Sequence, residues 1–247
     1  MQYGVQLYTL RSLPAADGVE AIATAGFDGV ELVGCDPVEV GACSVVAAHV
    51  GLDEIEADPA GTVARCRANG TETLVVPILG SEAFAAEGID GTAARLEAAA
   101  AAVADAGGRL LYHNHEFEFA ADAGVRGSGP SDETPFDRLV ALTTRLGFEI
   151  DVGWATAAGI DPVALIERVG DRVPIVHLKD VRVDPTAPRG GHPVDLGVGD
   201  VDLRGCLRAA ETAGVEWVVF EHDAPDDPVK SVRDAAAWLR TEPSGPR

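Results

Sequence analysis

Short runs of apolar and β-branched residues recur along the chain, and most segments between them have the periodicity of helices. Eight such runs predict strands: YGVQLYT (3–9), GVELV (29–33), VVAAHV (45–50), TLVVPI (73–78), LLYHNH (110–115), FEIDVGW (148–154), PIVHLKD (174–180) and WVVFEH (217–222). Helical patterns occupy residues 91–107, 161–170, 202–214 and 226–240. Strand and helix therefore alternate about every 30 residues, which is the length of a βα unit.

Several helical patterns carry start and stop signals. Asp161 and Asp227 each precede a proline, which places an N-cap residue ahead of proline at the first helical position. Gly107, Gly170 and Gly214 stand where the preceding helices would close. These signals support helices as connections between the strands.

Eight strands connected in this way predict a closed parallel α/β barrel, the (β/α)8 or TIM barrel. We expect residues 1–240 to form this one domain and residues 241–247 to form a flexible C-terminal tail. An open doubly wound sheet is the alternative, although no GxGxxG or GxxxxGK(S/T) motif follows any predicted strand. The segment between the second and third strands, GCDPVEVGACS, is too short for a full helix.

Two long connections, residues 120–135 and 181–200, are rich in Gly, Pro and Asp. They follow the fifth and seventh predicted strands, so both would lie at the carboxyl end of the barrel, where barrel enzymes place their active sites. Long connections without secondary structure are usually functional lids or mobile inserts. Arg189, Gly190 and Gly191 lie where barrels often hold a phosphate group, and a mobile lid explains them equally well.

The chain is strongly acidic, with 40 Asp and Glu against 19 Lys and Arg and a formal net charge of -21. Lysine occurs only at Lys179 and Lys230. Self-repulsion of this size destabilises a compact protein, and molar salt, with a Debye length of about 3 Å, largely removes it. We therefore expect a halophilic protein adapted to a salty cytoplasm, with an ordinary acidic enzyme as the alternative. Nucleic acid and anionic membranes are not expected as partners.

Cysteines and termini indicate the compartment. Cys35, Cys43, Cys66 and Cys206 form no CxxC pair, so we expect reduced structural thiols. The N-terminal MQYGVQLYTL lacks the features of a signal peptide, and no apolar run reaches membrane-spanning length. We expect a cytoplasmic protein.

Metal-ligating residue types stand at the carboxyl ends of six predicted strands: Glu31, His49, His113 with His115, Asp151, His177 and Glu221. Strands of a parallel barrel are otherwise apolar, so polar residues gathered at this end indicate a site. Imidazoles and carboxylates together are ligands for divalent transition metals. Because side chains alternate along a strand, Glu149 shares a face with Asp151, and Lys179 with His177.

A family resemblance covers nearly the whole chain. The blocks GVQLYTLR, GVEL, AHVGLDEI, YHNHEFEF, IDVGW, DPVALIERVGDRVPIVHLKD and GVEWVVFEHDAP resemble, in this order, those of the sugar phosphate isomerase/epimerase family of xylose isomerase-like TIM barrels. That family typically binds one divalent ion, often manganese, through an acidic residue on the fifth strand, Asp on the sixth, His on the seventh and Glu on the eighth. The resemblance implies Asp151, His177 and Glu221 as metal ligands, with Mn preferred and Zn, Co, Fe or Mg as alternatives.

The fifth strand departs from the family pattern. Many relatives read ENH where this chain reads HNH, so His113 takes the place of a glutamate that is both ligand and proton-transfer group in the epimerase branch. A lyase branch similar to inosose dehydratases also has histidines here. His113 is therefore expected to be the fourth ligand or an acid/base group, with hydrogen bonding to nearby loops as the structural alternative.

Three residues are expected to be catalytic. Glu221 is expected to be both ligand and base, with His113 as the second acid/base group if the metal leaves its nitrogen free. Lys179 would be a pocket cation that stabilises developing negative charge or a substrate carboxylate. Its structural alternative is a salt bridge to Glu149 or Asp180.

Five further residues are expected to bind the substrate: Glu31, His49, His115, Glu118 and Trp154. Structural explanations stand beside these roles. Glu31 could instead pair with Arg11, His49 could be a strand-end histidine with satisfied hydrogen bonds, and Glu118 could anchor the following loop. Trp154 could pack as an ordinary core residue rather than form a wall under a sugar ring.

These observations predict a divalent-metal-dependent isomerase or epimerase of a keto sugar or related polyol, which abstracts a proton next to a carbonyl that the metal polarises. An inosose dehydratase-like lyase on the same site and a non-catalytic sugar-binding barrel are the alternatives. An endonuclease IV-like DNA repair enzyme would need more ligands and a cationic groove. The partner is therefore a small sugar or polyol, and because family members often form dimers or tetramers, a homo-oligomer is left open.

Overall fold

The computed structural model describes residues 1–85, 88–120 and 133–241, and its central feature is a closed barrel of eight parallel strands. In spatial order these are β1 (Gln2–Gln6), β10 (Trp217–Phe220), β7 (Ile175–Leu178), β6 (Gly147–Asp151), β5 (Arg109–His113), β4 (Thr73–Val76), β3 (Ser44–His49) and β2 (Gly29–Val33). Because β1 pairs with both β2 and β10, the sheet has no open edge. The predicted TIM barrel is confirmed, and the doubly wound alternative is excluded.

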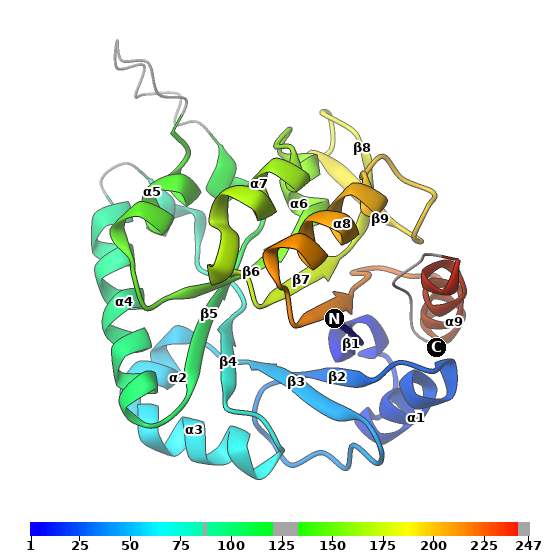
Figure 1. Ribbon diagram of the computed structural model, residues 1–247, viewed down its shortest axis with the longest axis horizontal. Coiled ribbons are helices and arrows are strands. Elements are labelled where there is room, and N and C mark those ends of the chain that lie inside the picture. The colour runs from blue at the N-terminus through cyan, green and yellow to red at the C-terminus, as the bar shows by residue number, and fades with distance from the viewer. Residues whose placement is uncertain (86–87, 121–132, 242–247) are drawn as a thin grey trace.

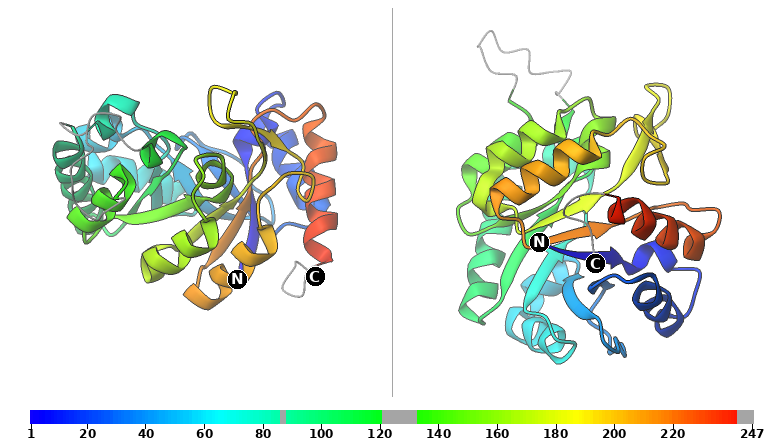
Figure 2. Two further views of the ribbon diagram at one scale, coloured as in Figure 1. Left: turned by 90° about the horizontal axis from the view of Figure 1, so that it is seen from above. Right: turned by 45° about the vertical axis from the view of Figure 1, so that its right-hand side comes forward.

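Helices cover the outside of the barrel (Figure 1, Figure 2). They are α1 (Ala15–Ala25), α2 (Leu52–Ala57), α3 (Pro59–Ala68), α4 (Ile89–Asp105), α5 (Pro135–Leu142), α6 (Val152–Ala157), α7 (Pro162–Val169), α8 (Leu203–Ala213) and α9 (Pro228–Arg240). Short 3-10 turns add η1 (Leu7–Leu10), η2 (Ser81–Phe84), η3 (Phe117–Phe119) and η4 (Gly170–Arg172). As expected, no helix separates β2 from β3.

The predicted helix ends agree with the structure. The Asp161 carboxylate accepts hydrogen bonds from the first amides of α7, and Asp227 caps α9 in the same way. Gly170 and Gly214 are the C-cap residues of α7 and α8, and Gly214 has the left-handed conformation, which a glycine adopts without steric cost. Local sequence therefore determines where these helices begin and end.

The interior of the barrel is apolar in its middle layer and polar at the carboxyl ends of the strands, which we call the upper end. A compact cluster of buried residues comprises Val46, Ala47, Val75, Leu111, Ile175 and Val219. Leu111 stands two positions before His113, and Ile175 two positions before His177. Alternate side chains of a strand share a face. The strands that supply this apolar cluster therefore also point His113 and His177 into the barrel, one layer closer to the carboxyl end.

The connection after β7 contains a hairpin that the sequence did not predict. β8 (Asp180–Val183) and β9 (Gly191–Val194) pair as antiparallel strands beside α6, shown in yellow in Figure 1. The expectation of a structureless connection over 181–200 is therefore wrong, because backbone pairing across the turn orders a composition rich in Gly and Pro. In the other long connection, residues 121–132 lie outside the described residues.

The expectation of four reduced cysteines is also wrong. Cys35, just after β2, is joined to Cys66 of α3 by a disulfide with a Cα–Cα distance of 5.0 Å. The two residues are 31 positions apart, so spacing alone carries no sign of the pairing. Cys43 and Cys206 are free and buried.

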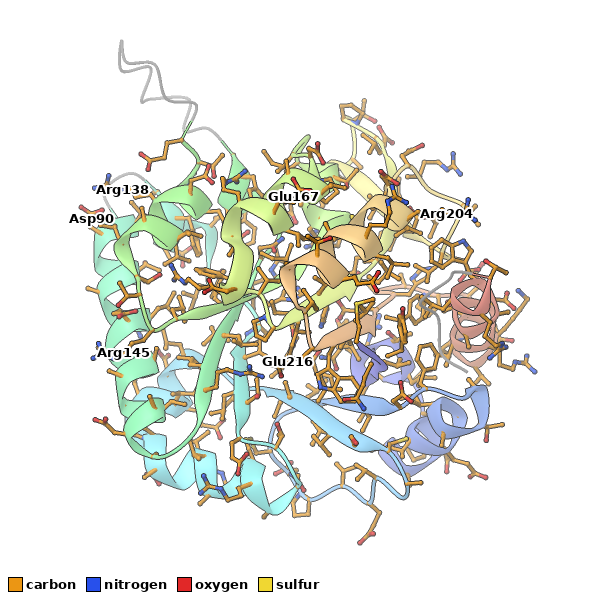
Figure 3. The ribbon with its side chains drawn as sticks, viewed as in Figure 1. Asp90, Arg138, Arg145, Glu167, Arg204 and Glu216 are labelled. Carbon is orange, nitrogen blue, oxygen red and sulfur yellow. A yellow bond between two sulfur atoms is a disulfide. The ribbon has the colours of Figure 1, made fainter. Side chains whose placement is uncertain are left out.

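Charged side chains are spread over the outer helices (Figure 3). Arg138 of α5 makes a two-point contact with Asp90 of α4, at 2.7 and 2.9 Å, and both side chains are largely exposed. Exposed pairs of this kind contribute little to stability individually. No helix within the described ranges is long and apolar enough to cross a bilayer.

Candidate functional site

Four residues identified in the sequence converge at the carboxyl end of the barrel. His113 ends β5, Asp151 ends β6, His177 lies on β7 and Glu221 directly follows β10. One potential ligand atom of each lies within 4.8 Å of the others, and all four side chains are buried. The pairing of β6 with β7 sets Asp151 beside His177, so strand register contributes directly to this geometry.

The donor atoms of this cluster fit a divalent cation. His177 Nδ1 lies 3.2 Å from Glu221 Oε2, and His113 Nε2 lies 3.8 Å from Asp151 Oδ2. Asp151 Oδ1 accepts a hydrogen bond from the Trp154 amide at 2.8 Å, whereas its buried Oδ2 accepts none. Asp151 Oδ2 faces His113 across the cluster, and its negative charge is balanced by the Lys179 ammonium at 2.9 Å. Two imidazoles and two carboxylates suit Mn, Zn, Co or Fe(II).

The central residue of the HNH segment aligns the two neighbouring strand ends. The Asn114 side-chain amide donates to the Asp151 carbonyl at 3.2 Å, and its oxygen accepts from the Asp151 amide at 3.0 Å. Asn114 is fully buried, so water does not compete for these bonds. The HNH sequence thus combines two histidines with a clamp on the backbone of Asp151.

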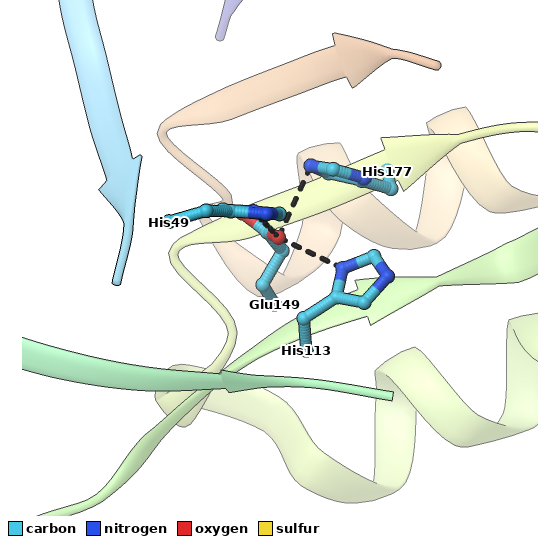
Figure 4. A group of neighbouring side chains, drawn as sticks. All are labelled: His49, His113, Glu149 and His177. Carbon is cyan, nitrogen blue, oxygen red and sulfur yellow. Dashed lines mark hydrogen bonds and ion pairs between the residues drawn. The ribbon is translucent and has the colours of Figure 1, made fainter. Parts of the chain in front are cut away.

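A second polar layer lies beneath this cluster, centred on Glu149 of β6. Its Oε1 atom lies 2.8 Å from His113 Nδ1, 3.0 Å from His49 Nε2 and 3.1 Å from His177 Nε2 (Figure 4). Glu149 is fully buried. Three imidazoles from three strands therefore meet at one carboxylate oxygen.

Glu31 of β2 completes the lower layer. Its Oε2 atom lies 2.6 Å from His177 Nε2 and 3.4 Å from His49 Nε2, and it accepts a hydrogen bond from Gln6 Nε2 at 2.9 Å. The alternative pairing of Glu31 with Arg11 is not formed, because Arg11 donates instead to backbone carbonyls of Tyr8 and Asp223. Glu31 and His49, expected to bind substrate, thus lie beneath the cluster, where Glu31 contacts His177 and His49 contacts Glu149.

Lys179 places a buried positive charge beside the proposed ligands. Its Nζ lies 2.9 Å from Asp151 Oδ2, 2.8 Å from Glu221 Oε2 and 2.8 Å from Asp223 Oδ2, and the side chain is 1% exposed. None of these ion contacts has the angles of a hydrogen bond at Nζ. The alternative partners, Glu149 and Asp180, are not used, since the Asp180 carboxylate accepts from backbone amides of the hairpin connection.

Burial and neighbouring charges set the protonation of the histidines. Burial opposes the charged form of His49, but Glu31 and Glu149 raise the pKa of His49 to about 10. The same two carboxylates outweigh burial at His177 and raise its pKa well above the usual value. Burial dominates at His113 and lowers its pKa far below that of a free imidazole, so His113 is neutral.

The carboxylates of the upper cluster differ from each other. Burial raises the pKa of Asp151, and Lys179 only partly offsets this effect. At Glu221 burial acts in the same direction, but Lys179 and His177 outweigh it and lower the pKa well below the usual value. Glu221 is therefore ionised.

Trp154 and His115 border the cluster. The guanidinium carbon of Arg189 lies 3.4 Å from the centroid of the Trp154 ring, and Arg189 also forms an ion pair with Glu116 at 2.8 Å. The His115 ring stands edge-on to His113 with centroids 5.0 Å apart, and its Nδ1 is buried without a partner in the described chain. Burial, together with Lys179 and Arg189, lowers the pKa of His115 to about 3, so this imidazole is neutral.

Glu118 lies apart from the cluster. Its carboxylate accepts hydrogen bonds from the Tyr112 hydroxyl at 2.6 Å and the His115 amide at 2.9 Å, and it is fully buried. This arrangement favours the loop-anchoring explanation of Glu118.

The sequence-based list omitted Glu149 and Asp223. Both stand two positions from a predicted ligand, Glu149 before Asp151 and Asp223 after Glu221, so strand alternation was the signal that could have identified them. Alternation alone does not say which partner either residue finds across the barrel.

The chain is similar in sequence and in fold to known proteins. A family model described as xylose isomerase-like TIM barrel matches residues 58–242. Inosose dehydratase from Lacticaseibacillus casei is 25% identical over 142 residues, which cover 51% of this chain and 44% of that protein. The match therefore spans less than half of the relative's own length.

Solved structures agree on the fold. A sugar phosphate isomerase/epimerase from Parabacteroides distasonis has a TM-score of 0.79 at 18% identity, covering 98% of this chain and 99% of that one. The IolI protein, solved with a zinc atom, has a TM-score of 0.71 at 14% identity, covering 96% and 97%. At these identities the likeness is one of fold.

Proposed function

Because the chain belongs to the xylose isomerase-like TIM-barrel family, we propose that it is a divalent-metal-dependent isomerase or epimerase of a keto sugar or related polyol. One observation carries the proposal: strands β5, β6, β7 and β10 bring two imidazoles and two carboxylates within 4.8 Å of one another at the carboxyl end of the barrel. In this family of barrels that end is where the chemistry takes place.

In this proposal His113, Asp151, His177 and Glu221 hold the ion. When bound, it would act as a Lewis acid on adjacent substrate oxygens and make the C–H bond next to the carbonyl acidic. Mn is our first choice, with Zn, Co, Fe and Mg as alternatives. His113 is better suited to ligation than to proton transfer, because its Nδ1 already contacts Glu149 and only Nε2 faces the cluster.

Proton transfer needs an atom that the metal leaves free. Glu221 is ionised, and whichever of its two carboxylate oxygens does not hold the metal can accept the proton from the substrate carbon. Once protonated, Glu221 can return the same proton to the adjacent carbon, which completes an isomerisation. His115 is neutral, and its Nδ1 has no partner among the described residues, so it can form a hydrogen bond with a substrate hydroxyl beside the reacting carbon. Lys179 offers a fixed ammonium that stabilises the negative charge developing on a substrate oxygen.

A lyase on the same site is the second candidate. The HNH segment and the similarity to inosose dehydratase favour it. In that reaction Glu221 removes the proton as before and then delivers it to the β-hydroxyl, which leaves as water. A sugar-binding barrel without catalytic activity is the third candidate. For each of them, the substrate is a small sugar or polyol.

Metal content tests the proposal. We would measure divalent metal per chain by plasma mass spectrometry at high salt for the wild type, Glu221→Ala and Glu216→Ala. Glu216 pairs with Arg109 at the start of β5, at the opposite end of the strands, and serves as the matched control. We expect near-stoichiometric metal in the wild type and the control, and a loss in Glu221→Ala.

A second assay separates the two reactions. Incubation with keto sugars and inososes in deuterated water should give deuterium exchange without net loss of water for an isomerase or epimerase. A dehydratase would form an ultraviolet-absorbing enolisable diketone. A wild type that takes up no metal after reconstitution would contradict the metal-dependent mechanism and favour the binding barrel.

We further propose that the protein works in a salty cytoplasm. This proposal rests on the net charge of -21 and the presence of two lysines in 247 residues.

A further inference from the structure

We propose that Glu149 and Glu31 form a carboxylate pair beneath the metal centre and determine which ring nitrogen His113 and His177 present to the ion. This inference rests on the proposed function, because it takes both histidines as ligands. The two glutamates are positioning residues: they contact the histidines from below and act on the metal through them.

Glu149 determines the orientation of His113. His113 Nδ1 lies 2.8 Å from Glu149 Oε1, and the pair is almost completely buried, with side-chain exposures of 3% and 0%. A carboxylate can only accept hydrogen bonds, so Nδ1 must carry the proton. A neutral imidazole with its proton on Nδ1 has a bare Nε2, and this is the atom that faces Asp151.

Glu31 determines the orientation of His177, but it does so through Nε2 rather than through Nδ1. His177 Nε2 lies 2.6 Å from Glu31 Oε2 and 3.1 Å from Glu149 Oε1, so Glu31 is the nearer acceptor. Glu31 therefore keeps a proton on Nε2, and Nδ1, which lies 3.2 Å from Glu221, is the nitrogen that would give up its proton when the ion binds. The two histidines therefore present different nitrogens, His113 its Nε2 and His177 its Nδ1.

The glutamates are themselves held in place by buried donors. Gln6, which is paired with Glu31 in the β1–β2 register, donates to Glu31 Oε2 at 2.9 Å. His49 Nε2 lies 3.0 Å from Glu149 and 3.4 Å from Glu31, and its positive charge balances part of their negative charge. Rigid outer partners of this kind typically change metal affinity 10- to 100-fold when removed.

One competing arrangement uses the same atoms. His49, His113, Glu149 and His177 also bring one ligand atom each within 4.8 Å, so the ion could sit in the lower layer. That position would require bare nitrogens at His113 Nδ1 and His177 Nε2. The 2.6 Å contact between His177 Nε2 and Glu31 instead has the length of a strong charge-assisted hydrogen bond.

The experiment compares zinc-loaded wild type with Glu149→Gln, Glu31→Gln and Glu97→Gln. Glu97 serves as the matched control, because the hydrogen bonds that it accepts from described residues all come from the loop around Thr144 and Arg145. Zinc affinity is measured by chelator competition. Imidazole ¹⁵N resonances report which ring nitrogen carries the proton and which binds zinc.

We expect one zinc per chain in the wild type, with His113 protonated at Nδ1 and His177 at Nε2. Glu149→Gln should weaken zinc binding 10- to 100-fold and perturb mainly the His113 signals, and Glu31→Gln should do so through His177. Glu97→Gln should leave both readouts unchanged. Unchanged affinity in both lower-layer variants, zinc on His113 Nδ1, or a second zinc per chain would overturn the inference.

The failure of the proposed function would look different. A wild type that takes up no zinc contradicts the metal site, yet the ring N–H resonances of His113 and His177 still report their pairing in the metal-free protein. Selective loss of the His113 signal in Glu149→Gln and of the His177 signal in Glu31→Gln would then show the two pairings. Absence of both effects would refute them.

Discussion

At the scale of single residues, the two lysines of the chain have contrasting environments. Lys179 is 1% exposed and contacts three carboxylates, whereas Lys230 is 58% exposed and pairs with Asp234 on the same helix. Removing one partner of a buried ionic group leaves the others uncompensated, which typically costs about 3–5 kcal/mol. We predict a loss of this size for Lys179→Met in urea unfolding, with little change for Lys230→Met. Equal unfolding midpoints of the two variants would contradict the structural role of Lys179.

Glu118 makes folding stability depend on pH. Burial raises its pKa from 4.5 to about 7, so between these values the folded state holds a proton that the unfolded state releases. Its contribution is therefore fully present below about pH 4.5 and is lost as the pH rises through 7. Glu118→Gln keeps an acceptor for the Tyr112 hydroxyl and removes the ionisation.

We predict that wild type loses up to about 3 kcal/mol relative to Glu118→Gln between pH 5 and pH 8. Urea unfolding of both proteins at the two pH values measures this difference, and other titrating groups cancel in the comparison. A difference between the proteins that is the same at both pH values would show that Glu118 is ionised throughout.

At the scale of elements, the start of α6 packs directly on the stem of Lys179. A Cβ atom at Gly153 would come 2.8 Å from Lys179 Cγ, whereas one at Gly91 in α4 would meet nothing within 4 Å. We predict that Gly153→Ala lowers the unfolding free energy by roughly 1–3 kcal/mol through overpacking. Gly91→Ala should raise it by roughly 0.5–1 kcal/mol, because alanine restricts the unfolded chain. Thermal and urea unfolding would measure both, and a neutral Gly153→Ala would show that Lys179 can shift without cost.

At the scale of the whole molecule, the net charge of -21 dominates the response to salt. Surface pairs such as Arg138 with Asp90 lose attraction in salt, but the repulsion among the excess carboxylates is screened as well. We predict that the Tm rises by at least about 4 °C between 0.1 and 2 M KCl at pH 7, which corresponds to ~1–2 kcal/mol. Scanning calorimetry should find a smaller rise at pH 5, closer to the pI of about 4.5. A Tm that falls with KCl would contradict the proposed salt adaptation.

Much of this protein follows from local sequence. Apolar runs of strand length alternate with helical patterns, which predicts eight βα units. Asp161 marks a helix start because its carboxylate accepts hydrogen bonds from free amides, and Gly214 marks a helix end because a residue without Cβ adopts the left-handed conformation freely. Polar residues at the strand ends, such as His113 and Asp151, were predicted to gather because parallel strands of a barrel share one carboxyl end. These features depend on contacts within a few residues or on the general geometry of the fold.

Only the tertiary structure decided how those residues are paired. Glu149 meets His49 from 100 positions away, and Glu31 meets His177 from 146 positions away, because the register of the closed barrel brings their side chains to the same layer. The Cys35–Cys66 disulfide and the β8–β9 hairpin likewise arise from contacts that composition does not encode. Sequence alone thus determined the fold and which residues reach the mouth of the barrel. Closure of the barrel, which fixes the distances across it, determined which atoms of those residues face each other.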